Sequence, residues 1–315
     1  MRPGNLVGIG ALLLGGLAVL FIACDTTGET GDVPGIEDLQ IFPPDNPWNT
    51  DVSGYAVHPL SSRFVASIGA DGGLHPDFGT TWQGVPNGIP YAVVGADQPP
   101  VPIFFTAYGE ESDPGPYPVP DDAPIEGGEA SDGDRHVIVI ERDGQMLYEL
   151  YRAFRRDDGW EAESGAKWDL ASNAVRPRHW TSADAAGLPI FPGLVRYDEV
   201  LTGRIDHALR FTVGRTQRGF IFPARHHASN STDPDLPPMG LRLRLMATVD
   251  ISDFSETNRV ILQALKRYGM FVADNGGDWY LSGAPDPRWD DGDLAELRRI
   301  KGSDFEVVYT GEIER

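Results

Sequence analysis

Short apolar runs separated by loops rich in Gly and Pro follow residue 40, and this pattern predicts a protein built mainly of β-strands. The stretch RHVIVIER, residues 135–142, is the clearest of these runs. A strand there places His136 and Ile138 on one face and Val137 and Val139 on the other, because successive side chains point to opposite sides. We therefore expect His136 at the start of a strand.

Similar runs predict further strands and two hairpins. The expected strands cover residues 146–154, 207–213, 219–224 and 241–249. Asp143-Gly144 is a strong turn signal before residue 146, and Asn275-Gly276 predicts a second hairpin within residues 270–283.

Arginines occur within two of the apolar runs, alternating with leucines in one run and as a single residue in the other. In residues 241–249 the leucines are expected inside, with Arg242 and Arg244 on the solvent side. In residues 207–213, Arg210 is expected on the face opposite to the apolar side chains.

Helices are few. Residues 255–269 form the best candidate, with Ser255 as N-cap and Gly269 as the stop, and shorter helices are expected at 293–300 and 61–69. Strands and helices do not alternate, which argues against a doubly wound α/β fold. We therefore predict a mainly β protein, a β-sandwich or jelly-roll-like single domain with long loops and two or three short helices.

The start of the chain predicts export. Residues 1–24 have a basic start and a long apolar run that ends in FIAC, which is typical of a signal peptide. This end resembles the lipobox of bacterial lipoproteins, which implies lipidation of Cys24 and anchoring to the cell membrane, facing the periplasm or the exterior. Residues 25–40 are expected to be a flexible acidic tether, and residues 41–315 the single β-rich domain.

The composition excludes several classes of binding partner. The formal net charge of −21 argues against nucleic acid, and against anionic lipid beyond the N-terminal anchor. No phosphate-binding glycine motif is present, so we expect no nucleotide. The only cysteine is Cys24, so the body has neither a disulfide nor a cysteine-bound zinc.

Residues 203–227 stand out in so acidic a chain, because they hold five arginines and three histidines against the single acid Asp206. Arginine clusters bind carboxylate or sulfate well. The alternative is that these arginines form ion pairs on the surface, each of little energetic value.

The seven histidines lack the spacing of a metal motif, so no resident metal or other cofactor is expected, and a three-histidine metal site stays an alternative. We predict His136, His207 and His226 as the proton-transfer residues, since each lies at the end of an expected strand. The expected anion holders are Arg210 and Arg225, and Tyr148 and Glu149 are weaker catalytic candidates.

Other signals are less specific. Asp274 is expected to stabilise the Asn275-Gly276 turn. The acidic loop 108–134 is long enough to wall a cleft beside His136. Seven tryptophans and ten tyrosines offer aromatic faces on which sugars can stack.

Several blocks resemble a group of exported bacterial proteins of uncharacterised function. The blocks include HALRFTV at 207–213, ARHHAS at 224–229 and YGMFVADNGG at 268–277. The resemblance implies export and a β-rich fold, and it carries over no catalytic residue.

These observations lead to two hypotheses of different classes. The first is an extracytoplasmic, lipid-anchored enzyme that acts on a polysaccharide or cell-envelope glycan, as a glycosidase or a lyase. The second is a non-catalytic lipoprotein that binds carbohydrate or supports the envelope. Convergence of the three histidines with an arginine and a carboxylate in one cleft favours the enzyme.

Overall fold

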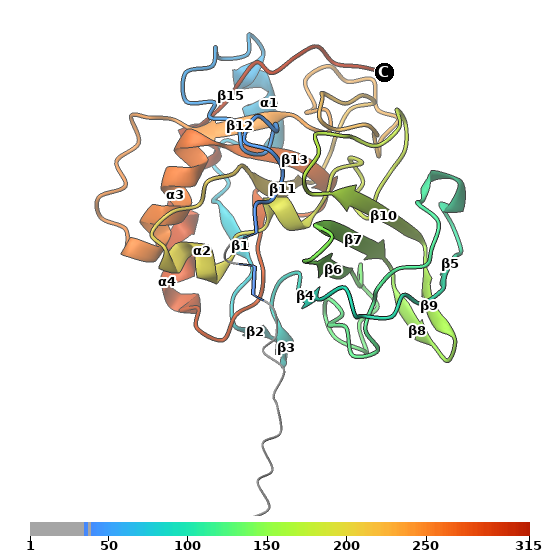
Figure 1. The fold of residues 1–315 in the computed structure, drawn as a ribbon. Coiled ribbons are helices and arrows are strands. Elements are labelled where there is room, and N and C mark those ends of the chain that lie inside the picture. The colour runs from blue at the N-terminus through green and yellow to red at the C-terminus, as the bar shows by residue number, and fades with distance from the viewer. Residues whose placement is uncertain (1–34, 37–38) are drawn as a thin grey trace, which may run out of the picture. The chain divides into compact units, whose positions relative to one another are not determined.

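The computed structural model of the protein describes residues 35–36 and 39–315, which belong to one compact unit (Figure 1). The expected signal peptide, Cys24 and most of the expected tether lie outside the described residues. None of the described helices is long and apolar enough to cross a membrane.

The largest element is a six-stranded sheet that mixes parallel and antiparallel pairs. Its order is β1 (His75–Asp77), β14 (Tyr280–Ser282), β11 (Leu209–Val213), β13 (Met270–Asn275), β12 (Arg242–Leu245) and β15 (Phe305–Val307). The pairs β1–β14 and β11–β13 are parallel, and the others are antiparallel.

A four-stranded sheet forms the second part of the unit, and smaller sheets lie around it. Its order is β10 (Ser164–Asp169), β7 (Met146–Tyr151), β6 (Val137–Glu141) and β4 (Tyr91–Val94). The smaller sheets are the hairpin β2 (Thr81–Trp82) and β3 (Val85–Pro86), and the set β5 (Ile103–Phe105), β9 (Gly159–Ala162) and β8 (Phe154–Arg156).

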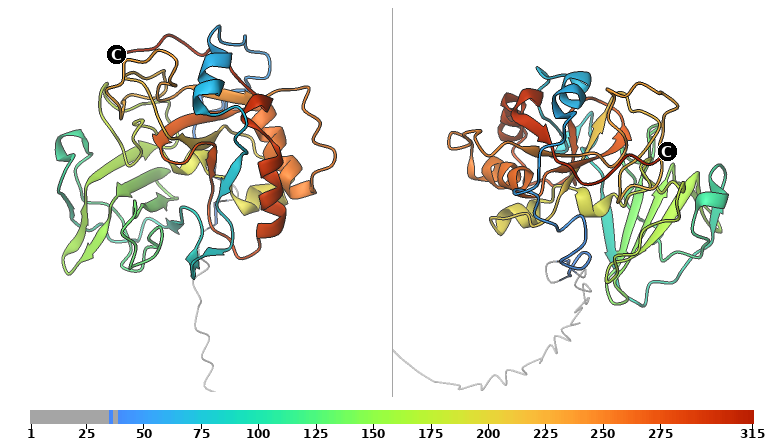
Figure 2. Two further views of the ribbon diagram at one scale, coloured as in Figure 1. Left: turned by 180° about the vertical axis from the view of Figure 1, so that it is seen from behind. Right: turned by 90° about the horizontal axis from the view of Figure 1, so that it is seen from above.

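Helices lie mainly on the side of the six-stranded sheet away from β6, β7 and β10 (Figures 1 and 2). The α-helices are α1 (Ser61–Ile68), α2 (Tyr197–Leu201), α3 (Glu256–Arg267) and α4 (Asp291–Ala295). The 3₁₀ turns are η1 (Gly109–Glu111), η2 (Phe191–Gly193), η3 (Glu296–Arg299) and η4 (Gly302–Asp304). The expected N-cap of α3 is confirmed, since the Ser255 side chain accepts the Asn258 N–H.

The alternating side chains of RHVIVIER, residues 135–142, pack into two separate cores. Ile138 and Ile140 of β6 enter the main core, which also contains Leu209 of the six-stranded sheet. Val137 and Val139 enter a smaller core on the other face. The four-stranded sheet is thus buried on both faces, and the main core joins it to the six-stranded sheet.

The predicted β-rich chain with few short helices is confirmed. The sandwich or jelly-roll form is not confirmed, because parallel pairs run through three of the sheets. The prediction of a hairpin within residues 270–283 is wrong, since β11 lies between β13 and β14 and pairs with both. The strand expected at 219–224 is also wrong, because only isolated bridges at Phe220 occur there.

The solvent side predicted for Arg242 and Arg244 is wrong as well. The guanidinium of Arg242 donates to the carbonyls of Tyr268, Pro47 and Thr50, at 2.7–2.8 Å. Residues 47–55 therefore cover the outer face of β12 and leave both arginines buried.

The last part of the expected tether packs onto the domain. Ile36 and Leu39 are partly buried against the main core, and the Leu39 N–H donates to the Ile36 carbonyl at 3.0 Å.

Candidate functional site

Three neighbouring strands bring polar side chains to one face of the six-stranded sheet. Arg210 lies on β11, Ser282 on β14 and Asp274 on β13. Arg210 is in register with Phe271, but an irregularity after Phe211 brings Thr212 into register with Asp274. This one-residue bulge turns Asp274 to the face that Arg210 occupies, because each added residue reverses the side on which the next side chain lies.

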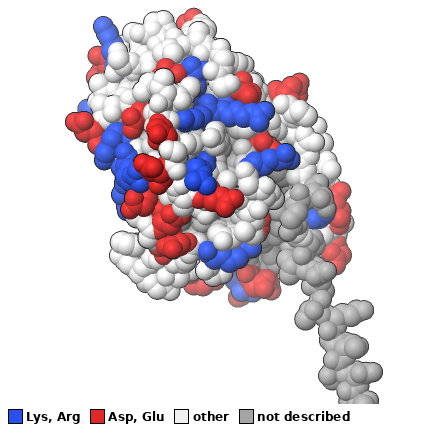
Figure 3. Space-filling model, turned by 90° about the vertical axis from the view of Figure 1, so that its left-hand side faces the viewer, with Lys and Arg blue, Asp and Glu red and all other residues white. Residues whose placement is uncertain are grey.

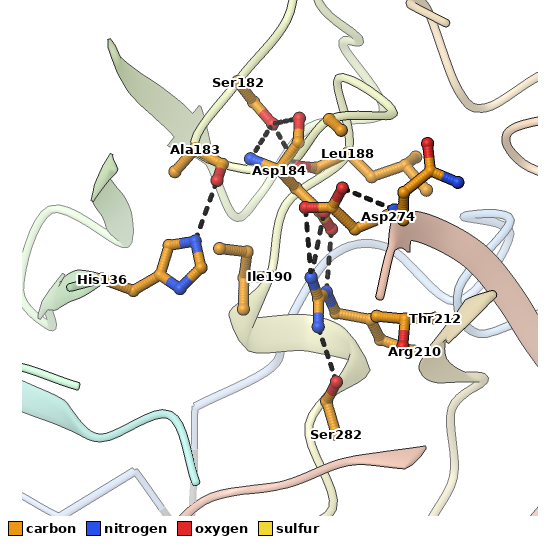
Figure 4. A network of polar contacts seen from close by, with 12 residues as sticks. His136, Ser182, Ala183, Asp184, Leu188, Ile190, Arg210, Thr212, Asp274 and Ser282 are labelled. Atoms are coloured by element: carbon orange, nitrogen blue, oxygen red, sulfur yellow. Dashed lines mark hydrogen bonds and ion pairs between the residues drawn. The ribbon is translucent and has the colours of Figure 1, made fainter. Parts of the chain in front are cut away.

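Arg210 is the centre of a buried polar network (Figure 4). Its Nε and Nη2 donate to the two carboxylate oxygens of Asp184, at 2.9 and 3.1 Å, and its Nη1 donates to Ser282 Oγ. Nη2 also lies 3.9 Å from Asp274 Oδ2. A bidentate pair of this kind fixes both side chains, and its burial keeps the charges close together.

The loop between β10 and η2 delivers Asp184 to this network. Ser182 Oγ accepts the Asp184 N–H at 2.9 Å and donates to the Leu188 carbonyl at 2.6 Å. Gly187 has a φ of +67°, and a Cβ there would lie 2.5 Å from the Trp180 carbonyl oxygen. The loop therefore depends on a serine bridge and on a glycine where other residues would be strained.

His136 supports the same loop from the other sheet. Its Nε2 donates to the Ala183 carbonyl at 3.0 Å, and its Nδ1 lies 2.6 Å from Glu126 Oε2. Burial alone would lower the pKa of His136, but the Glu126 carboxylate outweighs it and raises the pKa to about 9. His136 is thus a buried cation that holds the loop, and it is not free to exchange protons with a ligand.

A cavity of about 390 Å³ lies beside this network. The residues that line it include the acids Asp134, Asp184 and Asp274, the histidines His226 and His227, and the tyrosines Tyr108 and Tyr151. The side chain of Asp184 is fully buried, so this residue does not present its carboxylate to the cavity. Tyr108 and Asp134 belong to the acidic loop 108–134, which therefore contributes to the wall of a cavity. Both sheets contribute side chains, since Tyr151 ends β7 and Asp274 lies near the end of β13.

Asp274 is the titratable group whose environment suits acid catalysis best. Burial and the neighbouring Asp184 carboxylate raise the pKa of Asp274 to about 7, although Arg210 acts in the opposite direction. The side chain keeps 24 % of its surface exposed. Asp274 can therefore carry a proton near neutral pH and still reach a ligand in the cavity.

His226 has the geometry of a proton acceptor in the same cavity. Its Nδ1 lies 2.8 Å from the Ala185 carbonyl, which can only accept, so Nδ1 carries the hydrogen. The neutral ring then has its lone pair on Nε2.

His207 does not join His136 and His226. It lines a separate cavity of about 870 Å³, where Nε2 lies 3.1 Å from Glu199 and Nδ1 donates to the Ala208 carbonyl. Arg196 pairs with Glu199 at 2.6 Å. Because these groups satisfy one another, the larger cavity shows no free proton-transfer group at His207.

Glu149 and Tyr148 lie outside both cavities and on opposite faces of β7. Glu149 is fully buried and accepts the N–H groups of Ile190 and Phe191 at 2.9 Å, which holds the start of η2. Tyr148 packs against Tyr117, with ring centroids 5.1 Å apart. The structure thus gives both residues packing or capping roles.

The predicted anion holders also have other partners. Arg210 has its guanidinium engaged by Asp184 and Ser282, so it cannot hold a substrate carboxylate. Arg225 Nε donates to the Arg176 carbonyl at 3.1 Å. The local sequence predicts a turn role for Asp274 and gives no signal for Asp184, because neither the bulge in β13 nor the loop 181–190 has a recognisable local pattern.

Within the described part of the chain, no three His, Cys, Asp or Glu side chains are grouped as a metal ion requires. In comparisons with known proteins, no family model, no curated protein and no solved structure matches this chain.

Proposed function

We propose that the protein is an enzyme that cleaves glycosidic bonds of a polysaccharide, with its active site in the cavity between Asp274 and His226. The observation that carries this proposal is Asp274, whose pKa of about 7 makes it an acid near neutral pH. The residue stands on a strand beside the rigid Arg210–Asp184 pair, as a catalytic acid requires.

In this mechanism Asp274 gives its proton to the glycosidic oxygen while the bond to the sugar carbon breaks. His226 Nε2 takes a proton from the water molecule that attacks that carbon. Asp184 is a positioning residue, since its side chain is fully buried and acts on Asp274 through charge. Tyr108 and Tyr151 offer aromatic faces for the sugar rings.

The expected lipid anchor on Cys24 would hold this enzyme outside the cytoplasm, where envelope or extracellular glycans are the available substrates. The competing function is carbohydrate binding without turnover, for which the same phenols and imidazoles would suffice. The two functions differ in whether Asp274 transfers its proton to the glycosidic oxygen.

The experiment is an assay of reducing-end release from a panel of neutral and acidic polysaccharides. We expect cleavage of at least one of them, and a loss of about 100-fold or more in kcat for Asp274→Asn, the usual scale for removing a catalytic acid. Because the acid must be protonated, the wild-type rate should fall as the pH rises above about 7.

The matched control is Asp278→Asn, since Asp278 follows the same strand and accepts the Gly214 N–H at 2.6 Å. This variant should retain the wild-type rate. Equal rates for Asp274→Asn and wild type would overturn the proposal. Binding of an oligosaccharide without cleavage by the wild type would establish the non-catalytic function instead.

A further inference from the structure

The strand β4 is an open edge of the four-stranded sheet. It pairs with β6 on one side, and no described strand pairs with its other side (Figure 1). Its first three residues, Tyr91, Ala92 and Val93, are only partly buried. An edge of this kind can accept a further strand, because half of its backbone groups have no partner in the sheet.

The register of β4 on β6 shows which backbone groups are unpaired. The Arg142 N–H donates to the Val94 carbonyl at 3.0 Å, so Val94 directs its backbone groups toward β6. Since this direction alternates along a strand, Ala92 also faces β6, whereas Tyr91 and Val93 direct their N–H and C=O groups away from it. These outward groups have no hydrogen-bond partner among the described residues.

The open edge lies along a further cavity, of about 610 Å³. Residues 90–94 form one side of this cavity, and the segments 122–124, 196–198 and 284–286 also line it. Ala123 belongs to the smaller core and Tyr197 packs against the main core, so the lining segments cover opposite faces of the sheet. A strand added to β4 would therefore lie between the same two layers as β4 itself.

The lining of this cavity is acidic. Asp122 is exposed and forms no ion pair with a described side chain. Asp198 and Asp286 share a single cation, Arg288. Arg196 also lines the cavity, but it is buried and its charge is neutralised by an ion pair. The excess of carboxylates favours a basic occupant.

We propose that the edge of β4 binds an extended basic segment of another protein, which adds a fifth strand to the four-stranded sheet. Tyr91 and Val93 would exchange backbone hydrogen bonds with this segment, and Asp122 would pair with one of its lysines or arginines. Because loops flank the edge on both faces, a slender segment fits better than the edge of a second folded copy. The binding is independent of the glycan cavity, since no residue lines both cavities.

The test is equilibrium binding of short capped peptides to the full chain. The probes are a pentapeptide of alternating lysine and valine, its counterpart with glutamate in place of lysine, and two N-methylated forms of the lysine peptide. One form is methylated at odd positions and the other at even positions, because only one set of amides can face β4. We expect the lysine peptide to bind about tenfold or more tightly than the glutamate peptide, and only one methylated form to lose binding.

A proline in β4 tests the pairing from the side of the protein. Val93→Pro removes an outward N–H and leaves the hydrogen bonds to β6 intact, since proline is compatible with the free side of an edge strand. This variant should bind the lysine peptide about fivefold or more weakly. Val93→Ala, which keeps the N–H, should bind it like the wild type.

A neighbouring pair of acids separates the cavity from the general negative charge of the chain. Asp122→Asn should lower the preference for lysine over glutamate about two- to fivefold. Asp121→Asn is the matched control, since Asp121 pairs with Arg155 and does not line the cavity. This change should leave the preference as it is in the wild type.

Equal binding of the lysine and glutamate peptides, or equal binding of the two methylated forms, would overturn the inference whether or not the protein cleaves glycans. Equal effects of Asp122→Asn and Asp121→Asn would overturn it too, and neither result depends on the folding of Val93→Pro. A dimer of the chain that Val93→Pro abolishes would replace the basic partner by a second copy.

Discussion

At the scale of single residues, burial raises the pKa of two carboxyl groups of this protein to similar values, although the two groups have different surroundings. Asp274 and Glu149 both titrate at about 7 because burial disfavours their charged forms. Asp274 faces a cavity, whereas Glu149 faces two backbone N–H groups at the start of η2. A raised pKa therefore identifies a functional acid only when the group can also reach a ligand.

The structural role of Glu149 has a pH signature. Its folded-state pKa of about 7 exceeds the ordinary value of 4.5, so between these values the unfolded state ionises while the folded state keeps the proton. The free energy of unfolding contributed by Glu149 therefore falls as the pH rises through this window. Glu149→Gln, which cannot ionise, should gain about 2–3 kcal/mol relative to wild type between pH 4.5 and pH 8.

Urea unfolding at the two pH values measures this gain. Glu149→Ala is the control, because it leaves two buried N–H groups without an acceptor and should lose about 2–4 kcal/mol at both pH values. A difference between Glu149→Gln and wild type that does not change with pH would contradict the account.

At the scale of elements, β12 shows that segments packed over a strand determine whether its charged side chains are buried or exposed. Arg242 alternates with leucines as on a solvent-facing strand, yet three backbone carbonyls of distant segments accept its guanidinium hydrogens. These contacts attach residues 47–50 to the outer face of the sheet.

Replacing Arg242 should weaken the packing of residues 47–50 on the sheet. We expect Arg242→Met to lower the free energy of unfolding by about 2–4 kcal/mol, since several buried carbonyls lose their donor. Hydrogen exchange should accelerate at the amides of Val52 and Ala208, which bond to Arg267 and Trp48 across this segment. Arg63→Met, which breaks only an exposed pair with Asp235, should cost less than about 1 kcal/mol. Equal losses for the two variants would contradict this role.

The same scale shows what can be predicted from the sequence. The strand β6, the hairpin from β6 to β7 and the cap of α3 follow from local patterns, and they are confirmed. The order β14-β11-β13 could not be predicted, because two runs joined by Asn275-Gly276 look like a hairpin whether or not a third strand lies between them. The bulge that aims Asp274 depends on pairing with β11, which is a contact between distant residues.

At the scale of the whole molecule, the net charge of −21 does not make every surface acidic. The face seen in Figure 3 carries blue and red side chains next to one another. Of the arginines in residues 203–227, Arg204 pairs with Asp206 and Arg210 with Asp184, whereas Arg218 has no such partner among the described residues. The arginines of residues 203–227 thus include members of ion pairs and an exposed side chain, Arg218, that does not line the cavity.

The location of the cavity depends on both sheets. The main core joins them, and the polar network of Arg210, Asp184 and His136 connects side chains from both to the loop between them. The sequence contains the residues of this network, but only the packing of one sheet on the other brings them together.

The central claim is that Asp274 carries a proton near neutral pH on the wall of this cavity. Its most direct test is a titration of the ¹³C carboxyl resonance of Asp274, assigned by its disappearance in Asp274→Asn. We expect a midpoint near 7. A midpoint at the ordinary aspartate value of 3.8 would mean that the group is ionised at neutral pH, and would contradict its role as the acid.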